Sequence, residues 1–284
     1  EPDAYFLTLG NVIRSQLRFD LIFIVRRKTG CISTKKRRNF MKIVVLDGET
    51  TNPGDLSWER LEKLGELTVY ARTKPEELYE RAKEAELLIT NKTVLSGKMI
   101  RSLKNLKYIG TLSTGFNVVD IHAARKLGIP VCNVPSYCTN AVAQMTFSLL
   151  FALTNHVALH NHSVHQGDWE NSTDFCYWKA PLVELESKNF GVYGFGSIGR
   201  TVAKIAADLG MNVLVYSRTK KDMPSGYRWV SQEELFRESD VLSLHCPLTP
   251  ETTGLVNRKT LSLMKPTAYL INTSRGQVIR EQDL

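Results

Sequence analysis

The 284-residue sequence has few cysteines and no apolar run long enough to cross a membrane. The five cysteines are an odd number and no two have CxxC spacing, so they predict reduced thiols rather than a disulfide framework or a zinc site. The longest apolar run near the start, residues 21–25, is short and lacks the cleavage site of a secretion signal. These absences predict a cytoplasmic protein without a membrane partner.

Outside its first forty residues the sequence has almost no excess of charge of either sign. Residues 1–40 contain nine Lys or Arg residues and three Asp or Glu residues, whereas the rest of the chain contains 28 Lys or Arg residues and 26 Asp or Glu residues. A body this close to neutral has no field suited to nucleic acid, so no nucleic-acid partner is expected. We interpret residues 1–40 as a disordered leader of doubtful origin and Met41 as the natural start. A nucleic-acid-binding or targeting arm is the alternative.

From residue 41 onward, apolar β-rich runs alternate with helical patterns, which predicts parallel sheets covered by helices. The pattern predicts two α/β domains, residues 41–140 and 141–284. A longer pattern over residues 141–160 predicts one helix that is buried at its apolar start. Strands are expected at 43–46, 67–70, 87–90, 108–112, 131–134, 241–245 and 268–272, and shorter helices at 58–64, 76–85, 97–103, 120–127 and 258–264.

The most informative segment, residues 190–218, has the pattern strand, glycine turn, helix, strand. In such a unit Gly194 permits the tight turn, Gly196 lets the backbone approach a phosphate, and Gly199 lets the helix pack close to the strand. The helix N-terminus then directs its free N–H groups and its positive dipole end at the phosphate charge. The segment therefore predicts a dinucleotide site, with a glycine turn in some other α/β protein as the alternative.

The tip of the second strand in this unit lacks a carboxylate. NAD-binding units carry an Asp or Glu there, about 20 residues past the glycines, for the ribose hydroxyls. This chain has Ser217, Arg218, Thr219, Lys220 and Lys221 instead. A guanidinium with neighbouring ammonium groups suits a 2′-phosphate. We therefore expect NADP(H) to be preferred over NAD(H), while a solvated basic loop is the alternative interpretation.

Several sequence blocks follow one another in order from Met41 to the last residue. They are STGFNVVD (113–120), VPSYCTNAVAQMTFSLL (134–150), GFGSIG (194–199), HCPLTPETTGLVN (245–257) and MKPTAYLINTSRG (264–276). Together they resemble the D-isomer-specific 2-hydroxyacid dehydrogenase family, and DFCYWKAPLVEL (174–185) is similar to its glycerate dehydrogenase, or hydroxypyruvate reductase, branch. The resemblance implies a flavodoxin-like α/β substrate domain at 41–140 and a Rossmann-type, doubly wound NAD(P)-binding domain at 141–284. It also implies an oxidoreductase that transfers a hydride from NAD(P)H to hydroxypyruvate or glyoxylate, giving D-glycerate or glycolate.

The same resemblance implies roles for individual residues. Arg275 would be the catalytic arginine that holds the substrate carboxylate and polarises its oxo group, which agrees with its place just after a strand. Ser113, Thr114 and Gly115 would form the loop whose backbone N–H groups receive that carboxylate. Cofactor contacts would come from Gly194, Gly196, Ser197, Ile198, Gly199, Ser217, Arg218, Thr219, Cys246, Pro247, Thr252, Asn272 and Thr273.

The family's catalytic glutamate and histidine lie beyond the RG block and are absent from this chain. Glu281 and Asp283 follow Arg275 too closely to be that glutamate, and no histidine follows His245. We therefore expect a C-terminally truncated fragment with little or no dehydrogenase activity. Four histidines between residues 156 and 165 lack an HExxH motif and clustered carboxylates, so no metal is expected.

Two other functions stay open at this point. A phosphoglycerate dehydrogenase-like enzyme would need extra basic residues for the substrate phosphate, which the sequence does not identify. A non-enzymatic NAD(P)-sensing protein, similar to co-repressors of this fold, would lack the glutamate and histidine in the complete gene. Residues 169–179 are dense in aromatics, and such a group is usually either core or interface. The resemblance implies dimerisation through the cofactor domain, in part through this segment, so the complete protein is expected to be a homodimer.

Overall fold

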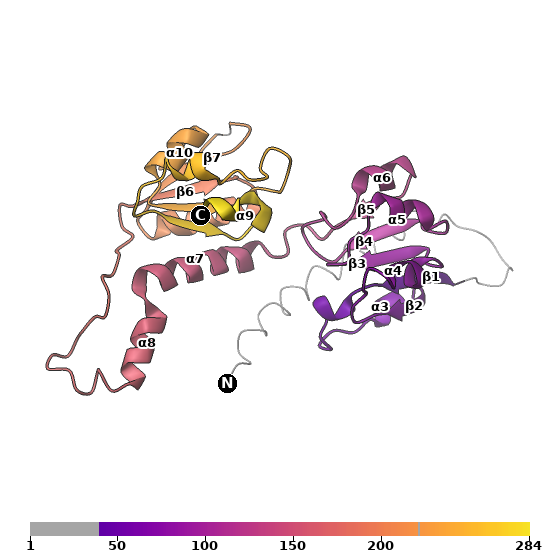
Figure 1. The fold of residues 1–284 in the computed structure, drawn as a ribbon, viewed down its shortest axis with the longest axis horizontal. Helices are drawn as coiled ribbons and strands as arrows, with labels where there is room; N and C mark the ends of the chain where they lie inside the picture. The colour runs from indigo at the N-terminus through magenta and orange to yellow at the C-terminus, as the bar shows by residue number, and fades with distance from the viewer. Residues whose placement is uncertain (1–39, 221) are drawn as a thin grey trace. The chain divides into compact units, whose positions relative to one another are not determined.

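The computed structural model describes residues 40–220 and 222–284 and divides the chain into two compact units, one ending at Cys138 and the other running from Thr139 to Leu284 (Figure 1). The leader interpreted above falls outside the described residues, apart from Phe40. Lys221 also falls outside them. Each unit is an α/β body with its own parallel sheet, which confirms the predicted fold class.

The first unit is a five-stranded parallel sheet in the order β2-β1-β3-β4-β5. This is the flavodoxin-like order, in which the chain reverses direction beside the first strand. Both faces are buried, because Val44 and Leu46 pack in one cluster while Ile43 and Val45 pack in another. The strands are β1 (Met41–Val45), β2 (Gly65–Val69), β3 (Leu87–Thr90), β4 (Tyr108–Thr111) and β5 (Val131–Cys132), and the helices are α3 (Glu59–Glu62), α4 (Leu78–Ala82), α5 (Gly97–Ser102) and α6 (Ile121–Lys126).

The second unit is a parallel sheet in the order β10-β9-β6-β7-β8, the Rossmann arrangement. Val192 and Val213 pack on one face, and Leu214 and Leu242 pack on the other. Its strands are β6 (Asn189–Tyr193), β7 (Asn212–Tyr216), β8 (Tyr227–Trp229), β9 (Val241–Leu244) and β10 (Tyr269–Asn272), and its helices are α7 (Thr139–Asn155), α8 (Val157–His165), α9 (Ser197–Asp208), α10 (Gln232–Glu238) and α11 (Arg258–Leu261). Short 3-10 turns occupy Gly48–Thr50, Gly276–Val278 and Glu281–Asp283.

The single helix predicted over residues 141–160 is wrong, because the segment is broken into α7 and α8. The break lies at His156, whose φ of 48° is left-handed and cannot continue a helix. The expected burial holds for one side of α7 only: Phe147 and Leu150 are buried, whereas Met145 and Leu149 are exposed. No single described helix is long and apolar enough to cross a membrane; α7 and α8 satisfy the length and composition criteria only jointly, as a pair bent by 58°.

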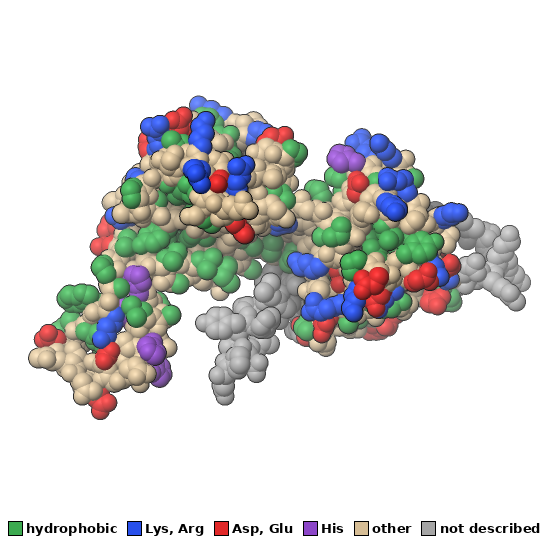
Figure 2. Space-filling view, viewed as in Figure 1, with side chains coloured by type: hydrophobic (Ala, Val, Ile, Leu, Met, Phe, Trp, Pro, Cys, Tyr) green, Lys and Arg blue, Asp and Glu red, His purple; other side chains and the backbone are tan. Residues whose placement is uncertain are grey.

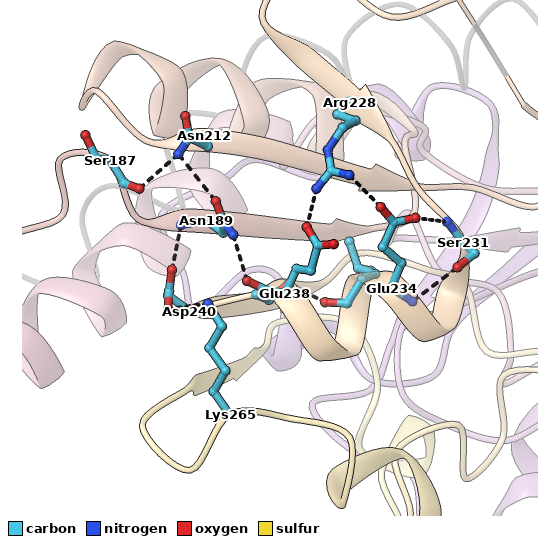
Figure 3. Close-up of polar contacts among 11 residues, drawn as sticks. Ser187, Asn189, Asn212, Arg228, Ser231, Glu234, Glu238, Asp240 and Lys265 are labelled. Carbon is cyan, nitrogen blue, oxygen red and sulfur yellow. Dashed lines mark hydrogen bonds and ion pairs between the residues drawn. The ribbon is translucent and has the colours of Figure 1, made fainter.

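A polar network fixes the amino ends of the strands in the second unit (Figure 3). Asp240 accepts the backbone N–H of Asn189 at 2.8 Å and a hydrogen bond from Lys265 at 2.8 Å. Partial burial raises the pKa of Asp240, but the bonds from Lys265 and Asn189 outweigh it and lower that pKa overall. Arg228 on β8 pairs with Glu234 and Glu238 of α10. These contacts fix the amino ends of β6 and β9 and join β8 to α10.

Candidate cofactor site and substrate loop

The glycine turn at the carboxyl end of β6 has the geometry that a dinucleotide site requires. Gly194 has a φ of 101°, and a Cβ there would lie 2.8 Å from the carbonyl oxygen of His245. A Cβ on Gly199 would lie 2.0 Å from the carbonyl oxygen of Gly194, so only glycine lets α9 pack this closely. Among the described residues, no atom lies within 4 Å of a Cβ placed on Gly196. Two glycines therefore serve the packing of the turn, and the third opens onto free space.

The first turn of α9 adds positive potential to that free space. Gly196 is the N-cap residue and provides no side-chain cap, and the first turn contains no acidic residue. The N–H groups of Ser197 and Ile198 belong to this turn, whose donors have no partner inside the helix. A helix of twelve residues has a sizeable dipole, so its N-terminus attracts an anion. The turn and the helix end together fit the pyrophosphate of a dinucleotide.

This turn lies at the point where the chain reverses direction in the sheet. β6 pairs with β7 on one side and with β9 on the other. Loops that follow β6 and β9 therefore leave the sheet in opposite directions and open a crevice between them, which is where ligands bind in open α/β sheets. Every predicted cofactor residue lies at or after the carboxyl end of β6, β7, β9 or β10. The structure thus brings all of them to one edge of one sheet.

The loop after β7 presents the basic group predicted to read the ribose. Ser217 is buried, and its hydroxyl donates to the carbonyl oxygen of Thr219 at 2.7 Å, which shapes the loop. Arg218 is exposed and has no ion pair or hydrogen bond with any other described residue. The Nζ atom of Lys220 lies 5.5 Å from the ring centroid of Trp229, a cation–π distance. The pKa of Glu251 is lowered, first by a hydrogen bond between Glu251 and Thr249 and to a smaller extent by the charge of Arg218.

The loop after β9 begins at a partly buried histidine, His245. The backbone N–H of His245 donates to the carbonyl oxygen of Tyr193 at 2.8 Å, and its Nε2 lies 2.8 Å from the Ser243 hydroxyl. Burial lowers the pKa of His245 to about 4, so the ring is neutral at pH 7. Burial also raises the pKa of the Cys246 thiol, which agrees with a packing role for this side chain. Thr252 donates to the carbonyl oxygen of Pro247 at 2.7 Å and so closes the rest of this loop.

The loop after β10 is ordered by one asparagine. The Asn272 Oδ1 atom accepts from the Ser274 backbone N–H at 3.0 Å and from its hydroxyl at 2.8 Å, while Asn272 Nδ2 donates to the Arg275 carbonyl oxygen at 2.8 Å. Thr273 lies 3.3 Å from the Thr146 hydroxyl of α7. The Arg275 side chain is exposed, and its Nη1 donates to the Ser274 carbonyl oxygen at 2.8 Å. Its guanidinium fork therefore keeps donors for a carboxylate.

The loop predicted to hold the substrate carboxylate follows β4 in the first unit. Ser113 donates its hydroxyl to the Gly115 carbonyl oxygen at 2.7 Å, and Thr114 donates to the Val134 carbonyl oxygen at 3.1 Å. Asn133 Nδ2 donates to the Thr114 carbonyl oxygen at 2.7 Å. The loop's side chains and carbonyls are thus bonded within the loop or to its neighbours. This arrangement leaves the backbone N–H groups as the groups that an anion would meet.

Two of the four histidines of residues 156–165, His160 and His165, bond to backbone atoms through their rings. His160 Nδ1 lies 3.0 Å from the His156 carbonyl oxygen, and His165 Nδ1 lies 2.8 Å from that of Asn161. His160 Nε2 accepts the backbone N–H of Lys179 at 3.2 Å. Within the described part of the chain, no group of three or more His, Cys, Asp or Glu side chains could hold a metal ion.

Comparison with known proteins identifies the family. Residues 147–284 match the model of the D-isomer specific 2-hydroxyacid dehydrogenase NAD binding domain. The chain is 46% identical over 249 residues to the hydroxypyruvate reductase of Blautia hydrogenotrophica, covering 86% of this chain and 77% of that one. This chain belongs to the D-isomer-specific 2-hydroxyacid dehydrogenase family. Glycerate dehydrogenase of Methylorubrum extorquens is 36% identical over 244 residues, covering 86% of this chain and 75% of the relative.

Solved structures agree with this membership. An acyclic imino acid reductase in complex with NADPH and D-Arg superposes with a TM-score of 0.76 at 33% identity, covering 86% of this chain and 77% of that chain. D-lactate dehydrogenase from Aquifex aeolicus, complexed with NAD and lactic acid, has a TM-score of 0.73 at 31% identity, covering 85% of this chain and 71% of the other. The predicted family, fold and enzyme class are confirmed. The chemistry of this 2-hydroxyacid dehydrogenase is hydride transfer between NAD(P)H and a 2-oxo acid.

Two structural residues of this dehydrogenase were not assigned from the sequence. Asn133 supports the Thr114 carbonyl from a neighbouring strand end, and His245 lies under the glycine turn. Asn133 lay inside the strand expected at 131–134, whereas β5 ends at Cys132 and places Asn133 directly after the strand, at the edge where ligands bind. His245 likewise lay inside the strand expected at 241–245, whereas β9 ends at Leu244.

Proposed function

We propose that the chain carries the cofactor- and substrate-binding parts of a reductase of hydroxypyruvate or glyoxylate, with the cofactor bound by residues 141–284 and the substrate received by residues 41–140. The observation that carries the proposal is the gathering of the glycine turn, the Arg218 loop, the Cys246 loop and Arg275 at one carboxyl edge. The relatives named hydroxypyruvate reductase and glycerate dehydrogenase support this choice of substrate. The free thiols of the described cysteines support a cytoplasmic location.

Within this proposal each loop holds one part of the cofactor. Gly194, Gly196, Gly199, Ser197 and Ile198 hold the pyrophosphate, because the turn has open space and unpartnered N–H groups there. Cys246 and Pro247 border the adenosine, and Thr252 keeps their loop closed next to a phosphate or ribose. Asn272 and Thr273 border the nicotinamide ribose. The nicotinamide, when bound, supplies the hydride.

Arg275 and the Ser113–Gly115 loop handle the substrate in this proposal. Arg275 donates bidentate hydrogen bonds to the carboxylate and polarises the neighbouring oxo group. The backbone N–H groups of Ser113, Thr114 and Gly115, in the first unit, are the donors proposed for a substrate carboxylate. The test is calorimetric titration of hydroxypyruvate into NADPH-saturated protein, followed by the same titration with Arg275→Gln.

Loss of charged hydrogen bonds should weaken hydroxypyruvate binding at least tenfold in Arg275→Gln, since each contributes about 1.5–3 kcal/mol. Arg280→Gln is the matched control, because Arg280 is an exposed arginine five positions further along the chain that forms an ion pair with Asp283. Equal weakening in both variants, or no binding by the wild-type protein, would contradict the assignment of this site.

We also propose that Ser217, Arg218 and Thr219 favour NADP(H) over NAD(H). The support is an exposed guanidinium without an ion-pair partner in the described chain, at a strand tip that lacks a carboxylate. Fluorescence titrations should give at least tenfold tighter binding of NADPH than of NADH, a difference of about 1.4 kcal/mol. Arg218→Gln should remove the difference by weakening NADPH alone, whereas Arg237→Gln, an arginine paired with Glu233, should preserve it. Equal affinities in the wild-type protein would remove the assignment.

A homodimer through the α7–α8 region is the last part of this proposal. Phe175, Trp178 and Trp169 have 91%, 71% and 59% of their surfaces exposed, and Met145 and Leu149 of α7 are exposed as well. Figure 2 shows hydrophobic side chains gathered over this part of the second unit. Large aromatic side chains this exposed are typical of an interface. Sedimentation should therefore give a dimer that Phe175→Ser with Trp178→Ser converts to a monomer, whereas Phe116→Ser, an exposed aromatic elsewhere, should not.

A further inference from the structure

A carboxylate is buried at the carboxyl end of β1, outside the site described above. Asp47 has only 2% of its surface exposed. Its Oδ1 atom accepts the backbone N–H of Asn91 at 2.8 Å, and its Oδ2 atom accepts those of Lys92 and Thr93 at 2.6 and 2.7 Å. The hydroxyls of Thr90 and Thr93 lie 3.1 and 2.9 Å from Oδ2. Asp47 therefore collects the donors of one short loop, residues 91–93, which follows β3.

That loop is held from a second direction by its own asparagine. The buried Asn91 side chain donates from Nδ2 to the Thr50 hydroxyl at 2.9 Å. Thr50 in turn donates to the Asp47 carbonyl oxygen at 2.8 Å. The backbone and the side chain of the loop thus both end on the turn after β1. Residues 91–93 have little freedom to move while Asp47 is in place.

The held loop runs beside the proposed carboxylate loop. β3 and β4 are neighbours with Thr90 opposite Thr111, and the Leu112 N–H donates to the Thr90 carbonyl oxygen at 2.9 Å. Beyond both loops the two segments meet again, where the Leu95 N–H donates to the Val118 carbonyl oxygen at 2.7 Å and the Leu95 carbonyl oxygen accepts from the Asp120 N–H at 3.0 Å. Backbone hydrogen bonds therefore join the two loops at both of their ends. A shift of residues 91–93 has to be transmitted to residues 112–118.

We propose that Asp47 is a positioning residue for the Ser113–Gly115 loop, and this rests on the substrate role proposed for that loop. Asp47 does not itself touch a ligand, because it is buried and its oxygens are occupied by the 91–93 loop. It acts by fixing residues 91–93, which in turn fix the ends of the substrate loop. The backbone N–H groups of residues 113–115 then keep the spacing that a small carboxylate needs, at no cost of ordering on binding.

The chemistry of the contact requires a carboxylate rather than an amide. Both oxygens face donors, so an asparagine at position 47 would direct one NH₂ group at an N–H or hydroxyl donor. Asp47→Asn keeps the volume and leaves at least one loop donor without an acceptor. Asp47→Glu keeps the charge but displaces the two oxygens by one methylene. The two variants therefore separate the need for the charge from the need for the position.

Hydrogen exchange in the protein without ligands tests the coupling, whatever the ligand is. In Asp47→Asn the amides of Leu95, Leu112 and Asp120 should exchange about tenfold or more faster, because their bonds join the two loops. The Tyr70 amide, which bonds to Val45 on the other side of β1, should be unaffected. Leu78→Ala, a buried residue of α4, is the control for general destabilisation and should accelerate all four amides alike. Faster exchange confined to residues 91–93 would overturn the proposal.

Titration with hydroxypyruvate, followed by ¹⁵N chemical shifts of residues 113–115, tests the link to binding. The wild-type amides should shift on saturation, and Asp47→Asn should bind about tenfold more weakly than Leu78→Ala of the same melting temperature. Partial recovery in Asp47→Glu would support a positional role. Equal affinity in Asp47→Asn and Leu78→Ala would overturn it. No response of the wild-type amides would refute the substrate role of the loop, and the exchange experiment would still judge the coupling through Asp47.

Discussion

His245 should make the second unit less stable as the pH falls from neutral towards 4. The residue lies where β9 meets the glycine turn, so closely that a Cβ on Gly194 would touch its carbonyl group. Its ring is partly buried beside Ser243, and this burial lowers its pKa from 6.5 to about 4. The change to examine is His245→Gln, because a glutamine amide reaches the position of Nε2 and can keep the bond to Ser243 without titrating.

The size and sign of the effect follow from the two pKa values. Between pH 6.5 and about 4 the unfolded chain binds a proton at this histidine and the folded protein does not, so the free energy of unfolding falls as the pH falls. The contribution is complete above pH 6.5 and is lost as the pH falls to about 4. At about 1.4 kcal/mol per pH unit the full loss is about 3 kcal/mol. In His245→Gln this part of the pH dependence should be missing.

Urea unfolding at intervals between pH 4.5 and 7.5 measures the effect, and the difference between wild-type and variant curves isolates His245 from the carboxylates that titrate in parallel. His122→Gln is the matched control, because His122 is an exposed histidine on α6 of the other unit, and it should leave the slope in place. The ring proton of His245 can be followed by NMR over the same range. Titration near pH 6.5, or parallel curves for wild type and His245→Gln, would refute the argument from burial.

Three further predictions concern the same unit. Gly196→Ala should have the wild-type melting temperature but bind NADPH at least tenfold more weakly. Gly199→Ala, whose Cβ would lie 2.0 Å from a carbonyl oxygen, should lose more than about 2 kcal/mol of stability. Equal melting temperatures of the two variants in calorimetry would contradict this. Asp240→Asn should cost about 1 kcal/mol at pH 7 and flatten the loss of stability below pH 4, since the pKa of Asp240 is lowered when folded; a urea titration that shows neither change would disprove it. Iodoacetamide should label exposed Cys176 well before Cys246, whose thiol pKa is raised by burial, and mass spectrometry showing equal rates would exclude that.

Local patterns were enough to predict the glycine turn and the order of elements around it. Gly194 and Gly199 are required by contacts within one βαβ unit, so their spacing in the sequence carries the information. The break at His156 could not be predicted in this way, because no residue type in the sequence marks a left-handed conformation at a position that is not glycine. β8 was not predicted, because it is an edge strand of three residues, too short for an alternation of apolar and polar residues to appear. α10 was missed as well, although Ser231 and Glu234 form a capping box at its start.

In the candidate site too, residues placed by local sequence patterns could be predicted, and residues placed by distant contacts could not. Residues that would touch a ligand stand directly after strands, and the rule that parallel sheets bind ligands at their carboxyl edge places them without any tertiary contact. Residues that hold those loops in place, such as Asp47 and His245, bond to partners that no local pattern can connect: Asp47 accepts from residues more than forty positions away, and His245 bonds to Tyr193.

Asp47 and His245 each hold in place a loop near a proposed anion site, one in each unit. A loop that offers backbone N–H groups to an anion cannot use them to fix its own shape, so the fixing has to come from groups that the ligand never meets. A carboxylate suits the 91–93 loop, which holds the ends of the substrate loop, because the atoms that residues 91–93 direct at Asp47 are donors. A neutral imidazole lies near the glycine turn, where a negative charge would repel the phosphates that the α9 N-terminus attracts. The charge of each supporting group is therefore matched to the atoms around it, and exchanging the two kinds of group would be expected to damage both loops.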